Sequence, residues 1–256
     1  MIGAGGARNS GGARTAGGAP AADDRTGGMA AGVAHPLGDA EIHFLWWFSQ
    51  GSIMDPDVRR RLRRAWGMCG RHAAGYLTVE ASLRHGYMHG PALLYEDLME
   101  RATATLTAGG MLRNLRIASR LQRAGPCLLC EMGYQQGREA PPSAADVVVE
   151  GRDVSYLRDF AGVCRRYWEP VVCSRCAGER GTARCREHLA EDLERGRLHD
   201  LASQRALAGH ITRHLINYAR SFRWEHRGTE TEEDRAALIA AAGWCSGWDG
   251  LLAVCS

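Results

Sequence analysis

Apolar side chains recur at three- and four-residue steps along most of the chain, which is the spacing of helices that bury one face. The first clear helix spans residues 55–67, where Asp55 precedes a proline at the first helical position and can cap the helix. A second helical pattern spans residues 91–125 and is interrupted at residues 109–110, where two glycines follow one another. The spacing therefore predicts amphipathic helices in this half of the chain.

The longest predicted helix follows Cys185 and extends over about 30 residues. Its apolar stripe consists of Leu201, Ala208, Ile211, Leu215, Tyr218 and Phe222. A last helix is predicted to begin after Thr231, with Asp234 three residues later as its capping partner, and to run through Ala242. Only the short run 147–149 has the β-branched character of a strand. The expected fold class is mostly α, built from helical repeats that carry zinc knuckles.

The chain divides into four segments by composition. Residues 1–34 are dominated by glycine and alanine and predict a disordered tail. Residues 35–135 form a first helical half, residues 136–153 with their adjacent prolines form a loop, and residues 154–256 form a second half. Since no run of about 18 apolar residues occurs, no membrane span is expected. Cytoplasmic localisation follows as the default expectation.

The sequence contains no lysine, so all 32 side chains counted as Lys+Arg are arginine. Chemistry that needs a lysine amine is therefore excluded, including Schiff-base formation, pyridoxal phosphate attachment and the Gly-Lys-Ser/Thr phosphate-binding loop. The formal net charge of +3 is too small to indicate nucleic-acid binding by itself. The nine cysteines are an odd number, and many are paired with a nearby cysteine or histidine. That pattern favours reduced thiols on metal over a secreted disulfide framework.

Two of the ligand pairs lie close together in the second half of the chain. Cys173 and Cys176 are followed, after eight residues, by Cys185 and His188. Two residues between the members of a pair let one turn direct both side chains at one tetrahedral ion, and thiolate with imidazole is the ligand set that suits zinc. This segment therefore predicts a complete structural zinc site. Glu187 is expected to favour the start of the following helix rather than to act as a base.

Two further pairs predict a second site, but their partners are open. Cys69 and His72 can join Cys127 and Cys130 in a Cys-Cys-Cys-His set. Alternatively, each pair stays within its own part of the chain, with His35 as a further ligand in the first and Cys164 in the second. A third reading is that these residues bind no metal.

The motifs form a weak internal repeat, because Gly67-Met68-Cys69-Gly70-Arg71-His72 is echoed by Gly162-Val163-Cys164-Arg165-Arg166-Tyr167. Together with the Cys127 and Cys130 knuckle and the segment Cys185-Arg186-Glu187-His188-Leu189, this pattern over residues 35–243 resembles an uncharacterised family of bacterial cysteine-rich helical proteins, a domain of unknown function. The family pattern repeats Cys-Pro-x-Cys followed by Gly-Phe-Cys-x-x-His. The present chain departs from it at three positions: His35 and Gly38 stand where the first knuckle cysteines would be, and Tyr167 stands where the second histidine would be. The resemblance implies no activity.

Arginines of the first half can form a binding surface. Four of them share one helical face without an acidic residue between them: Arg113, Arg116, Arg120 and Arg123. A second dense run consists of Arg59, Arg60, Arg61, Arg63 and Arg64. Guanidinium groups match phosphate, so both are candidates for nucleic-acid contact, although a solvated helix face is the simpler interpretation.

His210 and His214 also share a helix face and could hold a metal, but no acidic residue nearby in the sequence completes a site. We read them as a partly exposed histidine pair. The leading hypothesis for the whole chain is a zinc-stabilised helical protein that acts in binding or assembly, with an unknown protein partner. The alternatives are an enzyme with a metal centre formed by His35, Cys69 and His72, and a thiol redox or metal sensor that uses Cys127, Cys130 and Cys164.

Overall fold

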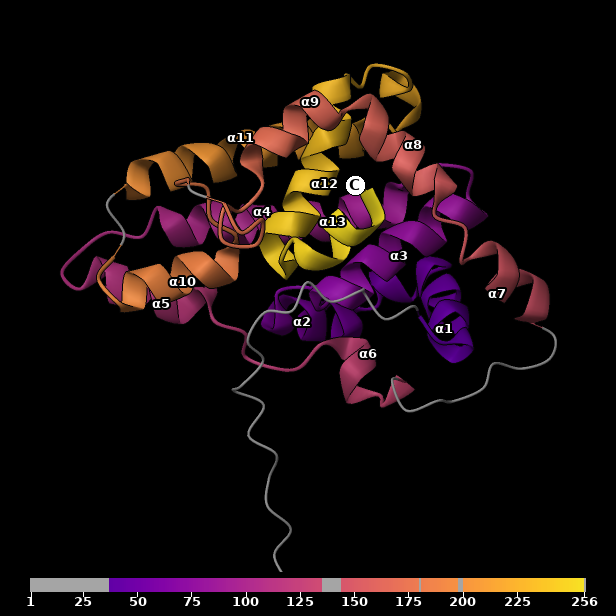
Figure 1. Ribbon diagram of the computed structural model, residues 1–256, viewed down its shortest axis with the longest axis horizontal. Coiled ribbons are helices and arrows are strands. Elements are labelled where there is room, and N and C mark those ends of the chain that lie inside the picture. Colours follow the sequence, from indigo (N-terminus) through magenta and orange to yellow (C-terminus); the bar gives the residue numbers. More distant parts are fainter. Residues whose placement is uncertain (1–36, 135–143, 180, 198–199, 256) are drawn as a thin grey trace, which may run out of the picture. The chain divides into compact units, whose positions relative to one another are not determined.

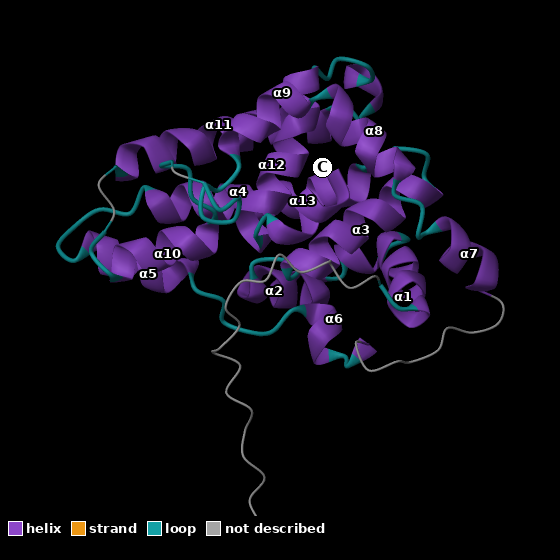
Figure 2. Cartoon of the chain, viewed as in Figure 1, coloured by secondary structure: helices purple, strands orange, loops and turns teal. Residues whose placement is uncertain are grey.

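The computed structural model describes residues 37–134, 144–179, 181–197 and 200–255. Within these residues every regular element is helical, as Figure 2 shows, and the expected mostly α class is confirmed. The predicted tail 1–34 and His35, which follows it, lie outside the described residues. None of the described helices has the length and hydropathy that crossing a membrane requires.

Figure 1 shows the order of the helices along the chain. In order, the α-helices are α1 (Asp39–Ser49), α2 (Pro56–Ala65), α3 (Gly70–Leu83), α4 (His89–Leu106), α5 (Arg113–Leu121), α6 (Leu128–Glu131), α7 (Ala145–Glu150), α8 (Ser155–Val163), α9 (Arg165–Trp168), α10 (Arg186–Glu194), α11 (Leu201–Arg220), α12 (Glu232–Ser246) and α13 (Asp249–Cys255). Short 3-10 turns occur at η1 (Ser52–Met54), η4 (Glu169–Val171) and η5 (Trp224–His226).

Local capping signals place two of the helix starts where the sequence predicts them. The Asp55 carboxylate accepts hydrogen bonds from the N–H groups of Asp57 and Val58 at 2.8 and 3.0 Å, which starts α2. Thr231 and Asp234 form the reciprocal capping box of α12. The predicted interruption at 109–110 is also present, because α4 ends at Leu106 and Gly110 adopts a positive φ of 98° before α5 begins.

Helix α12 lies at the centre of the hydrophobic core. From Ala236 to Ser246 every one of its residues is buried, including Trp244. A helix that is apolar on all sides must be surrounded, and α12 contacts α3, α4, α8, α9, α10 and α11. Helix α11 packs against both α4 and α12, so elements of the two predicted halves lie against one another. These contacts bring ligand pairs from distant parts of the sequence within reach of each other.

Two expectations about elements are wrong. Residues 136–143 of the predicted loop 136–153 lie outside the described residues, and the rest of it contains helix α7. The three valines at 147–149 are helical rather than extended. Packing explains the change, because α7 lies against α1 and buries Val148. The long helix after Cys185 is shorter than the expected length: α10 ends at Glu194, and α11 is a separate helix of 20 residues.

Candidate metal centres

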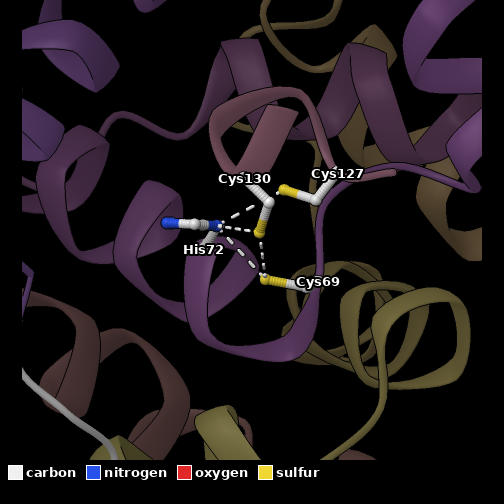
Figure 3. A group of neighbouring side chains, drawn as sticks. All are labelled: Cys69, His72, Cys127 and Cys130. Carbon is white, nitrogen blue, oxygen red and sulfur yellow. Dashed lines mark hydrogen bonds between the residues drawn. The ribbon is translucent and has the colours of Figure 1, made fainter. Parts of the chain in front are cut away.

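Four side chains from two parts of the chain meet at the start of α3. We call Cys69, His72, Cys127 and Cys130 the first cluster. Cys69 directly precedes α3, and His72 lies in the first turn of that helix. Cys127 directly precedes the short helix α6, and Cys130 lies within it. In Figure 3 the three sulfur atoms lie on the same side of the His72 ring and face one of its nitrogens. The two ligand pairs thus meet in one Cys-Cys-Cys-His set, and the alternative in which each pair stays within its own part of the chain is not the one formed.

The spacing of the ligand atoms in the first cluster fits one tetrahedral zinc ion. Zn–S bonds of about 2.3 Å and Zn–N bonds of about 2.0–2.1 Å place tetrahedral ligand atoms roughly 3.8 Å apart for two sulfurs and roughly 3.6 Å apart for sulfur and nitrogen. His72 Nδ1 lies 3.2, 3.4 and 3.5 Å from the sulfurs of Cys69, Cys127 and Cys130. The Cys69 and Cys130 sulfurs are 3.9 Å apart. The residues present therefore fit the ion.

A second cluster consists of Cys173, Cys176, Cys185 and His188. His188 Nδ1 lies 3.2, 3.4 and 3.3 Å from the three sulfurs in that order, and the Cys176 and Cys185 sulfurs are 3.8 Å apart. These distances match the same tetrahedron. The four residues of each cluster lie within one coordination sphere, and each set comprises three thiols and one imidazole.

The backbone shapes the second cluster as a compact knuckle. The Ser174 N–H donates to the Ala183 carbonyl at 3.1 Å, which closes the segment between the two ligand pairs. The Ala177 N–H donates to the Cys173 carbonyl at 3.0 Å and forms the turn between the first two thiols. Cys185 directly precedes α10, so His188 lies in the first turn of that helix. The local fold therefore directs all four side chains inward without any distant partner.

In both clusters the thiols hydrogen-bond to one another, which shifts their pKa values. In the first cluster a hydrogen bond from Cys69 is the main reason that the pKa of the Cys127 thiol is lowered to about 3, and the same bond raises the pKa of Cys69. In the second cluster hydrogen bonds from Cys176 and Cys185 lower the pKa of Cys173, and donation to Cys173 raises the pKa of Cys176. Protons thus hold each group of sulfurs together. A divalent cation can take their place and stabilise several thiolates at once.

A buried carboxylate lies behind His72, a partner that sequence reasoning missed. Glu41, on α1, has its Oε1 2.8 Å from His72 Nε2 and also accepts from Arg71 Nη1 and Nη2 at 2.6 and 2.5 Å. Burial alone would raise the pKa of Glu41, but hydrogen bonds from Arg71, His72 and the Gly38 N–H outweigh burial and lower it to about 2. Arg71 Nη1 also lies 2.9 Å from His72 Nε2, and the ionised Glu41 carboxylate accepts from both side chains when the His72 proton is on Nε2. The Nδ1 lone pair is then directed at the three sulfurs.

In the second cluster, salt bridges to Asp192 support the ligand residues. Asp192, on α10, accepts from Arg184 Nε at 2.6 Å and from Arg175 Nη1 at 3.3 Å, which ties the knuckle to the helix that carries His188. Within the described residues no carboxylate hydrogen-bonds to the His188 ring. Hydrogen bonds with Cys173 and Cys185 raise the pKa of His188 to about 10. The two clusters thus share their ligand type and differ in what supports the imidazole.

The other cysteines lie outside both clusters. Cys164 is buried, and its thiol donates to the Phe160 carbonyl at 3.3 Å, so it serves as a small core side chain. Cys245 is buried against the Met99 sulfur at 3.8 Å, and Cys255 is half-buried near the end of α13. The arrangement that would join Cys127, Cys130 and Cys164 in a sensor is not the one that the structure forms.

The expectation that nothing acidic accompanies His210 and His214 is wrong. Helix α12 brings Glu233 to the histidine pair, with its Oε1 3.2 Å from His210 Nε2 and 3.8 Å from His214 Nε2. No local sequence signal indicates this contact, because Glu233 belongs to another helix. The three residues form a third group of possible ligands.

The two runs of arginine differ in their partners. On α2, Arg59 and Arg63 lie 3.7 and 3.3 Å from the Asp97 carboxylate, and Arg61 pairs with Glu131 at 2.6 Å. On α5, by contrast, the exposed residues Arg113, Arg116 and Arg120 form no ion pair with any acid among the described residues. Arg123, just beyond α5, is half-buried and donates to the Met68 carbonyl at 3.5 Å.

A hollow of about 400 Å³ lies beside this face of α5. Its lining includes Arg63, Arg101 and Arg120, and no acidic residue contributes to it. The arginines of α5 are therefore not neutralised by acids of the described residues, whereas most of those of α2 are.

Comparison with known proteins returned no match to a protein-family model, to a curated protein or to a solved structure. The resemblance to a cysteine-rich helical family is therefore supported only at the level of a helical protein with two cysteine-rich clusters.

Proposed function

We propose that this chain is a zinc-stabilised helical protein that acts in binding or assembly, in which each cluster holds one structural zinc ion. The observation that carries the proposal is the ligand count. Each cluster offers four ligand atoms at tetrahedral spacing, and three protein ligands with an open fourth position would be the catalytic arrangement. A closed cage holds the ion and leaves no position for substrate. Binding surfaces then remain as the functional parts of the molecule.

The two alternatives have less support. An open centre of His35, Cys69 and His72 would require His72 to turn away from Cys127 and Cys130, whose sulfurs lie 3.4 and 3.5 Å from its Nδ1. A sensor built on Cys164 would need that thiol beside Cys127, whereas it donates to its own helix at the Phe160 carbonyl. Closed cages are therefore the better account of both ligand sets.

Elemental analysis tests the zinc part of the proposal. Purified protein should contain at least two zinc ions per chain, and Cys173→Ser should lower the count by one while the helical content stays unchanged. Cys164→Ser is the matched control, because this buried thiol lies in neither cluster, and it should leave the zinc content intact. Unchanged zinc in Cys173→Ser would refute the second site.

Binding of a phosphate-bearing polymer, RNA or DNA, is a second candidate role. It is favoured by Arg113, Arg116 and Arg120, which form no ion pair within the described part of the chain, next to the basic hollow lined by Arg63 and Arg101. Because contacts with phosphate release counterions, such binding would weaken as salt rises and would depend little on sequence. A protein with an acidic surface is the other partner that this face would accept.

A filter-binding titration at low and moderate salt distinguishes these partners. Changing Arg113, Arg116 and Arg120 to Gln should weaken binding similarly for every sequence, and should flatten the salt dependence by up to about one unit of slope for each phosphate that is no longer bound. Arg165→Gln is the control, since Arg165 is exposed but pairs with Glu169 at 2.8 Å. No binding at low salt would remove nucleic acid and leave a protein partner.

A further inference from the structure

The third group of ligands lies where two long helices pack against each other. His210 and His214 are one turn apart on α11, and Glu233 is in the first turn of α12. One carboxylate oxygen, Glu233 Oε1, lies 3.2 Å from His210 Nε2 and 3.8 Å from His214 Nε2. The three side chains are only partly buried, so an ion can reach them from solvent.

Asp234 fixes the orientation of one of these imidazoles. Its carboxylate accepts from the Thr231 N–H and hydroxyl, both at 2.9 Å, and from Asn217 Nδ2 at 3.3 Å. His214 Nδ1 lies 2.8 Å from Asp234 Oδ1. A carboxylate with this many donors acts as an acceptor, so His214 carries its proton on Nδ1. The lone pair of His214 Nε2 is then directed toward Glu233, another acceptor.

Two acceptors that face each other need a cation or a proton between them. His210 supplies the proton at present, because Arg213 Nη2, always a donor, lies 3.4 Å from His210 Nδ1 and leaves Nε2–H to donate to Glu233. An ion bound at His210 Nε2 requires the other tautomer, with the proton on Nδ1. Arg213 is exposed and can turn into solvent, so the change costs little. The net proton count of His210 stays the same.

We propose that His210 and His214, through their Nε2 atoms, and Glu233, through its carboxylate, bind a single divalent transition-metal ion. Asp234 is a positioning residue that acts through His214. The inference does not rest on the proposed function of the two thiolate clusters, because it uses none of their residues.

The ligand types indicate which ions fit. Two imidazoles and one carboxylate form the set that binds zinc in many enzymes and iron(II) in non-haem oxygenases, and it offers no soft thiolate. Three protein ligands leave coordination positions open to water or to a small ligand. A hollow of about 10 Å³ lined by Tyr167, His210 and Glu233 leaves room for about one water molecule beside the group. The hydrogen-bonded carboxylate behind His214 is the outer support that metal-bound histidines commonly have.

Equilibrium dialysis against cobalt(II), followed by elemental analysis, tests this site. The measured quantity is total zinc plus cobalt per chain, so any zinc already held by the third group is counted as well. The wild type should carry one more ion than the double variant His210→Ala/His214→Ala. Glu233→Gln, a partly exposed side chain at the helix start, should also lower the total by one and serves if the double variant folds poorly. His226→Ala, another partly exposed histidine, is the matched control.

Asp234→Asn keeps an acceptor for His214 and removes its charge. It should weaken cobalt binding about 10- to 100-fold without abolishing it. Equal metal totals in the wild type and in either ligand variant would overturn the proposal. Loss of an ion in His226→Ala would also overturn it, because the metal would then bind to surface histidines in general and not to this group. Helical content by circular dichroism verifies that the variants are folded.

Discussion

Replacement of Glu41 should separate the two thiolate clusters by affinity. In the first cluster the carboxylate lies 2.8 Å from the far nitrogen of the His72 ring, whereas no carboxylate hydrogen-bonds to His188 within the described residues. A carboxylate behind a metal-bound imidazole fixes the ring orientation and makes the ligand nitrogen more basic. Loss of Glu41 should therefore weaken zinc binding at the first cluster and leave the second unchanged.

The loss of zinc affinity expected without Glu41 follows from its role as the partner behind the His72 ring. Removing such an outer partner lowers metal affinity about 10- to 100-fold, which corresponds to about 1.4–2.7 kcal/mol. The Gly38 N–H and His72 bond to different oxygens of Glu41, so Glu41→Gln keeps an acceptor for only one of them. With that oxygen turned toward His72, we expect a loss near 10-fold. Glu41→Ala removes these bonds and those to Arg71, together with the capping interaction of α1, and should approach 100-fold.

Competition with a chromophoric chelator measures both ions in one titration. In the wild type the two zinc ions should leave at similar chelator concentrations, and in Glu41→Ala one should leave at a much lower concentration. Glu187→Ala, an exposed acid beside His188, is the control and should change neither ion. Unchanged affinities at both clusters in Glu41→Ala would refute this role of Glu41. Equal weakening of both would refute it as well, because it would report a general loss of folding.

Four further predictions concern the shared site, its protons and one helix cap. Cys69→Ser and Cys127→Ser should each release the same single zinc ion, and the double variant should release no more; additive loss in a zinc count would contradict a shared site. Zinc affinity should fall as the pH is lowered from 8 to 6, because raised thiol pKa values such as that of Cys69 mean that binding releases protons, which calorimetry in buffers of different ionisation enthalpy measures. Glu41, with a lowered pKa of about 2, contributes stability that is complete above about pH 4.5 and is lost as the pH falls toward 2, so a flat stability profile there would disprove its role. Thr231→Ala should lower the free energy of unfolding by about 1 kcal/mol in urea denaturation, since it removes the cap of α12, and no change would show that the cap is redundant.

Local sequence signals predicted the parts of the fold that depend on neighbouring residues. The capping side chains Asp55 and Thr231 act within one turn of the helices that they start, so their sequence context is sufficient. The ligand pairs are equally local, because two intervening residues determine how one turn directs two side chains. The second cluster could be proposed complete from the sequence, since its pairs are only 9 positions apart at their nearest members.

Features that depend on packing between distant helices could not be predicted. Glu41 lies 31 positions before His72, and nothing in the first helix marks it as a partner of the histidine. Glu233 reaches His210 only because α12 packs along α11, and a search of the sequence around the histidines therefore finds no acid. The valines of α7 favour a strand by propensity, yet burial against α1 determines a helix.

The two clusters differ in how much of the chain each one ties together. Cys127 lies 55 positions from His72, whereas Cys185 lies 9 positions from Cys176. Closing the longer loop costs an unfolded chain more entropy, and the logarithmic dependence on loop length makes the difference about 1.6 kcal/mol. An ion in the first cluster therefore stabilises the contact between α3 and the chain that leads out of α5, and its loss should lower the thermal midpoint of the whole protein. An ion in the second cluster acts mainly on its own knuckle. Its influence reaches the core through α10, which carries His188 and packs against α5 and α12.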